Sequence, residues 1–223
     1  MQVILLDIEG TTTPVNFVYE TLFPYARECL GEFVSKRLDP ADLKQLNIEY
    51  QNDSTPVKPK WEIPPIFYLF WLMDQDKKSP SLKSIQGQIW QTGYENGSIK
   101  GEVFPDVLPA LKKWKEQKKR VAIYSSGSVL AQKLLFKYNR NGDISKMIDA
   151  YFDTAVGPKK EPHSYNEIAK RMDVRCSDIL FISDSAAECV AAKVAGCQVR
   201  YSVRPGNKVE KVSFECIESF EEI

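Results

Sequence analysis

Two hydrophobic patterns divide the chain. Short apolar runs bounded by polar or turn-forming residues occur at its start and through its second half, and such runs predict buried strands. Between them lies a long stretch in which apolar residues follow helical spacing and no strand-like run occurs. The predicted strands are residues 3–6, 121–124, 151–156, 179–182 and 199–203.

Helical patterns separate the strands of the second half. The predicted helices are residues 105–117, 129–136, 164–172 and 186–195, and Gly196 closes the last one. Strands that alternate with helices are typical of a parallel sheet covered on both faces. We therefore predict an α/β fold whose core is a Rossmann-like parallel sheet formed by residues 1–16 and 101–223.

The stretch from residue 17 to 100 has a different character. Its predicted helices are residues 17–38, interrupted at Pro24, then 40–52, 66–74 and 82–94, with a proline-rich connection over 51–65. Its many aromatic residues are interpreted as core side chains rather than as a ligand site. The pattern predicts an all-helical domain inserted after the first strand.

Composition and charge narrow the class of protein. Lys plus Arg and Asp plus Glu both number 30, so the net charge gives no reason to expect nucleic acid or an anionic membrane as a partner. The basic run at 112–120 is interpreted as a solvated helix face, with a nuclear signal as the alternative. The apolar stretch at 63–73 is too short to span a bilayer.

Cysteine usage points to a cellular compartment. The chain has five cysteines and no Cys-x-x-Cys, which argues against a disulfide framework or a zinc site. Thiols that stay unpaired are typical of a reducing compartment. The sequence starts directly with a predicted strand and shows no signal-peptide pattern. We therefore expect a cytoplasmic protein, with the nucleus as a further possible location.

Acidic side chains follow the first predicted strand. Asp7 comes directly after it, and Glu9 follows two positions later, just before Gly10. If the backbone stays extended through Glu9, the two carboxylates point the same way and share a small volume. Two acids so close repel each other unless a cation or a proton lies between them, and Mg²⁺ fits. A capping acid after a strand is the alternative interpretation of this motif alone.

Two other predicted strands also end in polar residues. Ser125 and Ser126 follow the strand at 121–124, and Asp184 follows the strand at 179–182. In open parallel sheets, ligands bind outside the carboxyl ends of the strands. Hydroxyls and backbone N–H groups at such turns bind phosphate oxygens, although turn and capping chemistry also explains each residue on its own.

A lysine pair, Lys159 and Lys160, precedes the predicted helix at 164–172. A cation there can offset the charge of a phosphoryl group, whereas a solvated loop lysine is the commoner case. Carboxylates, hydroxyls and a cation are the groups that phosphoryl transfer needs. An aspartate can also attack phosphorus itself and form an aspartyl-phosphate that water later cleaves.

The order of these motifs resembles that of the haloacid dehalogenase-like (HAD) phosphatase superfamily. The matching positions are Asp7 to Thr11 after the first strand, Ser125 after the second, Lys159 before a later helix, and Asp184 after the fourth strand. The resemblance covers the whole predicted core. It implies a HAD-like fold in which residues 17–100 form a helical cap.

Glu9 stands where most members of that superfamily have aspartate. The form Asp-Ile-Glu-Gly-Thr resembles the enolase-phosphatases of methionine salvage. Further similar stretches are residues 22–25, 87–90, 93–94, 124–128, 131–136 and 204–207. The resemblance implies 2,3-diketo-5-methylthiopentyl 1-phosphate as the substrate, which is first enolised and then dephosphorylated to an acireductone.

The resemblance also implies roles for the acidic residues. Asp7 is expected to be the nucleophile and a metal ligand, and Asp184 a further metal ligand. Glu9 is expected to protonate the leaving oxygen and later activate water, while its backbone carbonyl completes the metal site. One Mg²⁺ per chain is the expected cofactor. The base of the enolisation step stays open between Glu9 and a residue of the helical insert.

Ser125, Ser126 and Lys159 are expected to bind the substrate through its phosphoryl group or its dione oxygens. The expected partner is a small phosphorylated metabolite, without nucleic acid or membrane, and the expected state is a monomer. Glu188 is left without an assigned role, and His163 is interpreted as a surface or helix-entry residue. Two alternatives stay open: a phosphatase of the same superfamily for another metabolite, and a catalytically silent phosphate-binding protein.

Overall fold

The structure is a computed structural model that describes residues 2–223. Chain contacts divide it into two compact units. One, the α/β unit, contains the chain up to Val18 and from Lys100 onward, and the other, the helical unit, contains Tyr19–Ile99. None of the helices within residues 2–223 combines the length and the apolar character needed to cross a membrane.

The α/β unit is built on a sheet in which every pairing is parallel. Its strands, in the spatial order β3-β2-β1-β4-β5-β6, are β1 (Val3–Leu6), β2 (Arg120–Tyr124), β3 (Ala150–Phe152), β4 (Ile179–Ser183), β5 (Gln198–Ser202) and β6 (Cys216–Ile217). Leu6 of β1 lies opposite Ile123 of β2 and Ile182 of β4. This register brings the carboxyl ends of these three strands to one edge. The predicted α/β fold is confirmed.

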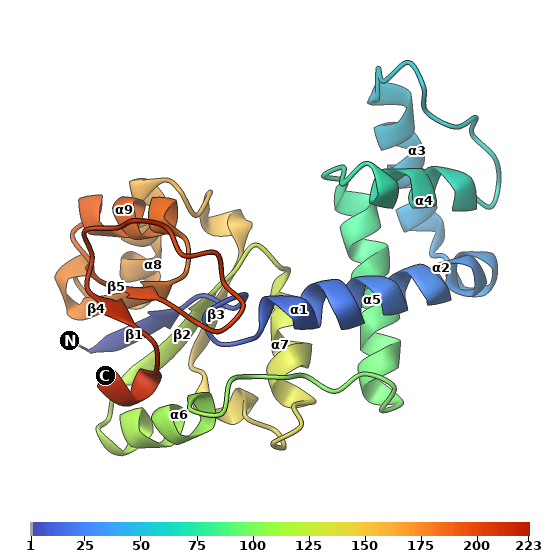
Figure 1. Cartoon of the computed structure of the whole chain (residues 1–223). Coiled ribbons are helices and arrows are strands. Elements are labelled where there is room, and N and C mark those ends of the chain that lie inside the picture. The colour runs from blue at the N-terminus through green and yellow to red at the C-terminus, as the bar shows by residue number, and fades with distance from the viewer. Residues whose placement is uncertain (1) are drawn as a thin grey trace. The chain divides into compact units, whose positions relative to one another are not determined.

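Helices cover both faces of this sheet, which is why β1 is apolar throughout and fully buried. Figure 1 shows α8 and α9 on one face and α6 on the other. The helices of this unit are α1 (Val15–Phe17), α6 (Val107–Glu116), α7 (Val129–Lys137), α8 (Pro162–Arg171) and α9 (Ala186–Val194). Lysines at 112, 113 and 115 are exposed on α6, as expected for a solvated helix face.

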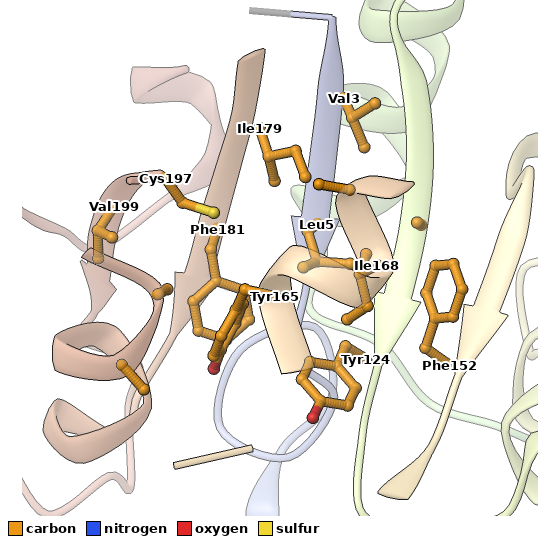
Figure 2. Close-up of a cluster of buried hydrophobic side chains, with 14 of the residues drawn as sticks. Val3, Leu5, Tyr124, Phe152, Tyr165, Ile168, Ile179, Phe181, Cys197 and Val199 are labelled. Atoms are coloured by element: carbon orange, nitrogen blue, oxygen red, sulfur yellow. The ribbon is translucent and has the colours of Figure 1, made fainter. Parts of the chain in front are cut away.

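The core on the α8 and α9 side of the sheet is shown in Figure 2. Val3 and Leu5 of β1 meet side chains of α8 there, including Tyr165 and Ile168. The rings of Tyr165 and Phe181 pack edge to face, with their centroids 5.1 Å apart. These side chains hold β1 from one side along its whole length.

Three details of the α/β unit differ from the prediction. The third strand ends at Phe152, because the Asp153 side chain accepts from the N–H of Ala155 and starts a 3-10 turn over Thr154–Val156. Helix α6 begins at Val107 rather than at residue 105 or 106. The short strand β6 has no counterpart among the predicted elements, because two residues are too few for a recognisable pattern.

The helical unit contains the remaining helices, which are α2 (Phe23–Arg37), α3 (Pro40–Asn52), α4 (Ile66–Asp74) and α5 (Pro80–Glu95). The predicted interruption near Pro24 occurs as a π-helical turn over Val18–Leu22. Proline lacks an N–H and its ring crowds the carbonyl four residues earlier, so the helix widens just before it. The role of this unit as a cap stays a prediction.

Candidate active site

Asp7 lies directly after β1, at the carboxyl edge of the sheet. Its side chain is buried, with 4 % of its surface exposed. Oδ1 accepts from Nζ of Lys159 at 2.6 Å and from the N–H of Ile8 at 2.8 Å, while Oδ2 accepts from the hydroxyl of Ser183 at 2.9 Å. These hydrogen bonds hold the carboxylate in one orientation.

The chain turns sharply after Asp7. Backbone N–H groups of residues 11–13 donate to the carbonyl of Ile8 at 2.9–3.1 Å. Gly10 has a φ of +69°, a backbone conformation that glycine adopts readily and other residues rarely do. The extended backbone that the prediction assumed through Glu9 therefore ends with β1, and Glu9 lies in the turn instead.

Glu9 nevertheless lies close enough to Asp7 to feel its charge. One oxygen of its carboxylate accepts from the hydroxyl of Ser125 at 3.3 Å. Burial, and then the charge of Asp7, raise the pKa of Glu9 above its usual value. A raised pKa favours the protonated carboxyl group, which is the form that a general acid needs.

Asp184 follows β4 and meets the same turn. Its backbone N–H donates to the hydroxyl of Thr11 at 3.1 Å. Its carboxylate lies so near Gly10 that a Cβ atom there would stand 2.1 Å from Oδ2. Burial, and then the charge of Asp7, raise the pKa of Asp184 to about 7. The capping alternative is wrong for Asp184, because the N-cap position of α9 is Ser185.

Lys159 lies inside the site rather than in solvent. Its Nζ is 2.6 Å from Oδ1 of Asp7 and 2.7 Å from a carboxylate oxygen of Glu188, and only 7 % of the residue is exposed. Burial opposes its charged form, but the charges of Asp7 and Glu188 outweigh burial and raise the pKa of Lys159. A solvated loop lysine describes the exposed Lys160 and not Lys159.

Glu188, left without a role by the sequence, belongs to this site. Besides pairing with Lys159, it accepts from the hydroxyl of Ser183 at 3.0 Å. Burial, and then the charge of Asp7, raise the pKa of Glu188 to about 7. The available signal was its place four residues after Asp184, in the first turn of α9. His163 is exposed at the start of α8, as expected.

The turn after β2 combines structural and site contacts. Ser125 is fully buried, and its hydroxyl both donates to Glu9 and accepts from the N–H of Gly127 at 3.1 Å. Ser128 caps α7 by accepting from the N–H of Ala131. Ser126 is exposed in the same turn. Turn chemistry is therefore present, and it brings Ser125 to the acidic residues.

Negative charge exceeds positive charge in this cluster. The carboxylates of Asp7 and Glu188 contact the ammonium group of Lys159, and those of Glu9 and Asp184 lie near enough to interact with its charge. A hard divalent cation with oxygen ligands suits such an excess of carboxylates. Within residues 2–223, no three His, Cys, Asp or Glu side chains are already arranged as a metal site. The suitability of this cluster for a divalent cation therefore rests on its oxygen donors and its negative charge. A backbone carbonyl oxygen would have to serve as one of the ligands.

In this parallel sheet, β1 is followed directly by a buried aspartate that is paired with a lysine. Comparison with known protein families identifies the class of protein to which the chain belongs. The family described as haloacid dehalogenase-like hydrolase matches residues 1–196. The chain therefore belongs to the haloacid dehalogenase-like hydrolase family. This membership confirms the predicted superfamily and the predicted class of hydrolase.

Relatives narrow the comparison further. Enolase-phosphatase E1 of Synechococcus elongatus is 48 % identical to this chain, over 99 % of the chain and 96 % of the relative. Enolase-phosphatase E1 of Acyrthosiphon pisum is 43 % identical, over 92 % and 88 %. The UTR4 protein of Saccharomyces cerevisiae has a crystal structure with a TM-score of 0.83, 36 % identity, and coverage of 100 % of this chain and 99 % of that one. The predicted resemblance to the enolase-phosphatases is confirmed.

Proposed function

We propose that this chain is a Mg²⁺-dependent enolase-phosphatase that acts on 2,3-diketo-5-methylthiopentyl 1-phosphate. The observation that carries the proposal is the buried carboxylate of Asp7, held between Lys159 and Ser183 at the edge of the sheet. The names of the relatives support the pair of activities. The substrate is the one that the family resemblance implies.

We propose that Asp7, the backbone carbonyl of Glu9 and Asp184 hold one Mg²⁺. When bound, Mg²⁺ offsets the charge of these carboxylates and of the phosphoryl group, and it polarises substrate oxygens. The raised pKa of Asp184 supports this assignment, because burial and then the charge of Asp7 disfavour the ionised carboxylate, and the charge of Lys159 only partly offsets them. Mg²⁺ would stabilise the ionised form of that carboxyl group.

Phosphoryl transfer uses Asp7 and Glu9 in two steps. A carboxylate oxygen of Asp7 attacks phosphorus, the bond from phosphorus to the substrate oxygen breaks, and Glu9 gives its proton to that oxygen. Glu9, now ionised, then takes a proton from a water molecule that attacks the aspartyl-phosphate. Phosphate leaves, and the carboxylate of Asp7 is restored.

Lys159 and the turn after β2 serve the transferred group. Lys159 offsets charge on the phosphoryl oxygens, because it is a buried cation 2.6 Å from the attacking carboxylate. Ser125 and Ser126 supply hydroxyl and backbone N–H donors for the phosphoryl or dione oxygens. In the enolisation step, a base removes the proton next to a substrate carbonyl. Glu9 and a residue of the helical unit are the two candidates for that base.

The remaining predictions concern the surroundings of the protein. A small phosphorylated metabolite as the partner follows from the proposed activity. The five cysteines are free, which supports a reducing compartment. The cytoplasmic location, the monomeric state, and the absence of nucleic-acid and membrane partners stay predictions.

The proposal is tested by measuring phosphate release from the dione phosphate, with and without Mg²⁺, in wild type and in Asp7→Asn. We expect Mg²⁺-dependent release in wild type and none above background in Asp7→Asn, because the amide cannot form the acyl phosphate. Asp173→Asn is the matched control, since Asp173 is exposed and has a positive φ of 51°, which asparagine accepts.

Three outcomes would contradict the proposal. Equal turnover in Asp7→Asn would remove the nucleophile from the mechanism. Faster release from sugar phosphates or from phosphoglycolate than from the dione phosphate would assign the chain to another phosphatase of the same family. Failure to release phosphate from any of these substrates would favour a silent phosphate-binding protein.

A further inference from the structure

A four-residue turn after β5 contacts the loop that follows Asp7. It consists of Arg204, Pro205, Gly206 and Asn207, and the N–H of Asn207 donates to the carbonyl of Arg204 at 3.1 Å. Proline at the second position and a glycine with a φ of +88° at the third are typical of a type II turn. The local sequence therefore favours this turn, and the turn directs the Asn207 side chain back toward the α/β unit.

Arg204 fixes the first end of this turn. It is 5 % exposed, its Nη1 lies 2.9 Å from Asp106, and its Nε donates to the carbonyl of Thr11 at 3.1 Å. Its guanidinium also lies over the rings of Phe104 and Phe220, at 4.8 Å and 4.5 Å from their centroids. A buried cation with these partners anchors the turn to the same loop that carries Asp7.

Asn207 contacts the loop at its sharpest point. Its Nδ2 donates to the carbonyl of Gly10 at 2.8 Å, and Ser202 donates to the same carbonyl at 3.2 Å. A Cβ atom on Gly10 would meet Oδ2 of Asp184 at 2.1 Å and Nδ2 of Asn207 at 2.9 Å. The amide and the carboxylate therefore crowd the same side of Gly10. Within residues 2–223, the buried Oδ1 of Asn207 has no hydrogen-bond partner.

We propose that Asn207 is a positioning residue for the acidic cluster, one that holds Gly10 against Asp184. It touches neither Asp7 nor Glu9 by any contact described above, and it acts through the backbone of the turn that carries them. Groups behind the ligands of a metal site that fix the ligands' positions typically change metal affinity or activity about 10- to 100-fold when they are removed. This inference rests on the proposed function, in which Asp184 and the Glu9 carbonyl hold Mg²⁺.

The test compares Asn207→Ala with wild type in two measurements on the full chain. The first is the Mg²⁺ concentration that gives half-maximal phosphate release. The second, made without substrate, is the rise in unfolding temperature when Mg²⁺ is added to metal-free protein, which reports binding through linkage. We expect Asn207→Ala to raise the half-saturating Mg²⁺ concentration about 10- to 100-fold and to reduce the rise in unfolding temperature.

Two further variants separate positioning from packing. Ser202→Ala removes the other donor to the Gly10 carbonyl but nothing next to Asp184, so we expect its Mg²⁺ requirement to stay within about twofold of wild type. Asn207→Asp keeps the size of the side chain, but when ionised it cannot donate to the carbonyl. We expect it to lower turnover at saturating Mg²⁺ at least as much as Asn207→Ala, whereas a purely space-filling role would leave it like wild type.

Wild-type Mg²⁺ dependence in Asn207→Ala would overturn the proposal, as would equal Mg²⁺ shifts in Asn207→Ala and Ser202→Ala. If Asn207→Ala does not fold, Asn207→Asp decides through the same two measurements. If wild type releases no phosphate from the dione phosphate, the proposed function fails. The substrate-free measurement then still decides the role of Asn207.

Discussion

The two units treat charged side chains in opposite ways. In the α/β unit, Asp7, Lys159 and Arg204 are almost completely buried. In the described part of the helical unit, no charged residue is buried to that degree, and pairs such as Arg27–Asp74 lie in solvent. Burying charge is costly unless it is paired and hydrogen-bonded. The α/β unit accepts this cost at the one edge of the sheet where the chemistry is proposed.

The helical unit is stabilised by aromatic rings instead. Tyr50, Tyr68 and Trp61 form edge-to-face and tilted contacts with centroids 4.9–6.2 Å apart. Lys77 lies over the ring of Trp71 and pairs with Asp53 at 2.9 Å. An ion pair by itself therefore does not indicate an active site. Complete burial and an excess of one charge distinguish the proposed active site from this structural pair.

The largest expected effect comes from replacing Lys159, with Lys77 of the helical unit replaced for comparison. Each of these lysines forms an ion pair with a carboxylate. Lys159→Met removes the only cation in contact with Asp7 and Glu188 within the described residues, so we expect phosphate release to fall about 10³-fold. Lys77→Met removes a partly exposed pair, so we expect turnover to stay at the wild-type value and stability to fall by about 1 kcal/mol or less. Steady-state kinetics and denaturant unfolding check both variants.

The comparison would break if the two variants behaved alike. Wild-type turnover in Lys159→Met would show that burial at the sheet edge serves structure alone. For Lys159→Met we also expect a loss of about 3–5 kcal/mol of stability, because it leaves buried carboxylates without their cation. Measuring turnover only on the folded fraction keeps the two effects apart.

A smaller effect is expected from Glu9→Gln. The amide has nearly the same shape but cannot exchange a proton, so we expect phosphate release to slow about 10²-fold, within the usual range for general acid–base catalysis. Aspartyl-phosphate on Asp7 should accumulate, because the attacking water then lacks its base. Trapping labelled phosphate on the protein during turnover checks this prediction, and unchanged turnover in Glu9→Gln would contradict it.

The smallest effect concerns pH, which should act on the two units in opposite directions. The pKa of Asp184 rises from 3.8 to about 7, so the folded state holds more protons than the unfolded state between these values. This contribution to stability therefore decreases as pH rises from about 4 to 7, and it is constant above that range. The pKa of Asp53 is lowered by the Thr55 hydroxyl and by Lys77, so its contribution is present above pH 4 and is lost as pH falls further.

The pH prediction is checked by thermal unfolding in the absence of divalent cations. We expect the unfolding temperature to fall by a few degrees between pH 5 and pH 7.5, and Asp184→Asn to flatten this slope. Asp53→Asn should leave the slope above pH 5 unchanged. A slope that Asp184→Asn leaves intact would show that the Asp184 carboxyl group does not cause it.

Periodicity and turn residues predicted most elements of the fold. The strand at residues 3–6 and the helix at 66–74 were correct to the residue, because clear polar or proline boundaries flank both. The third strand was predicted too long, since Asp153 diverts the backbone through a hydrogen bond that apolar pattern does not reveal. The two-residue strand β6 was not predicted, because it is defined by its pairing with β5 and not by a local pattern.

The site was less predictable than the fold. Asp7, Ser125, Lys159 and Asp184 were found because each follows or precedes a recognisable element, and the structure brings them together. The geometry of Glu9 was assumed from strand periodicity, whereas a turn at Gly10 places it. Glu188 was left aside because its contact with Lys159 is a tertiary one. The turn at residues 204–207 has a local signature, but the role of Asn207 was not predicted, because its contact with Gly10 joins residues 197 positions apart.

The central position of β1 in the sheet has a consequence for folding during synthesis. Among the strands of this sheet, β1 is synthesised first, yet its two neighbours are β2, which begins at residue 120, and β4, which begins at residue 179. Asp7, the proposed nucleophile, is therefore synthesised long before the strands that flank β1 are available. A nascent chain that ends before residue 179 contains Asp7 but lacks β4, and therefore lacks one of the two strands that flank β1. The edge of the sheet that carries the proposed active site is therefore completed only after β4 has been synthesised.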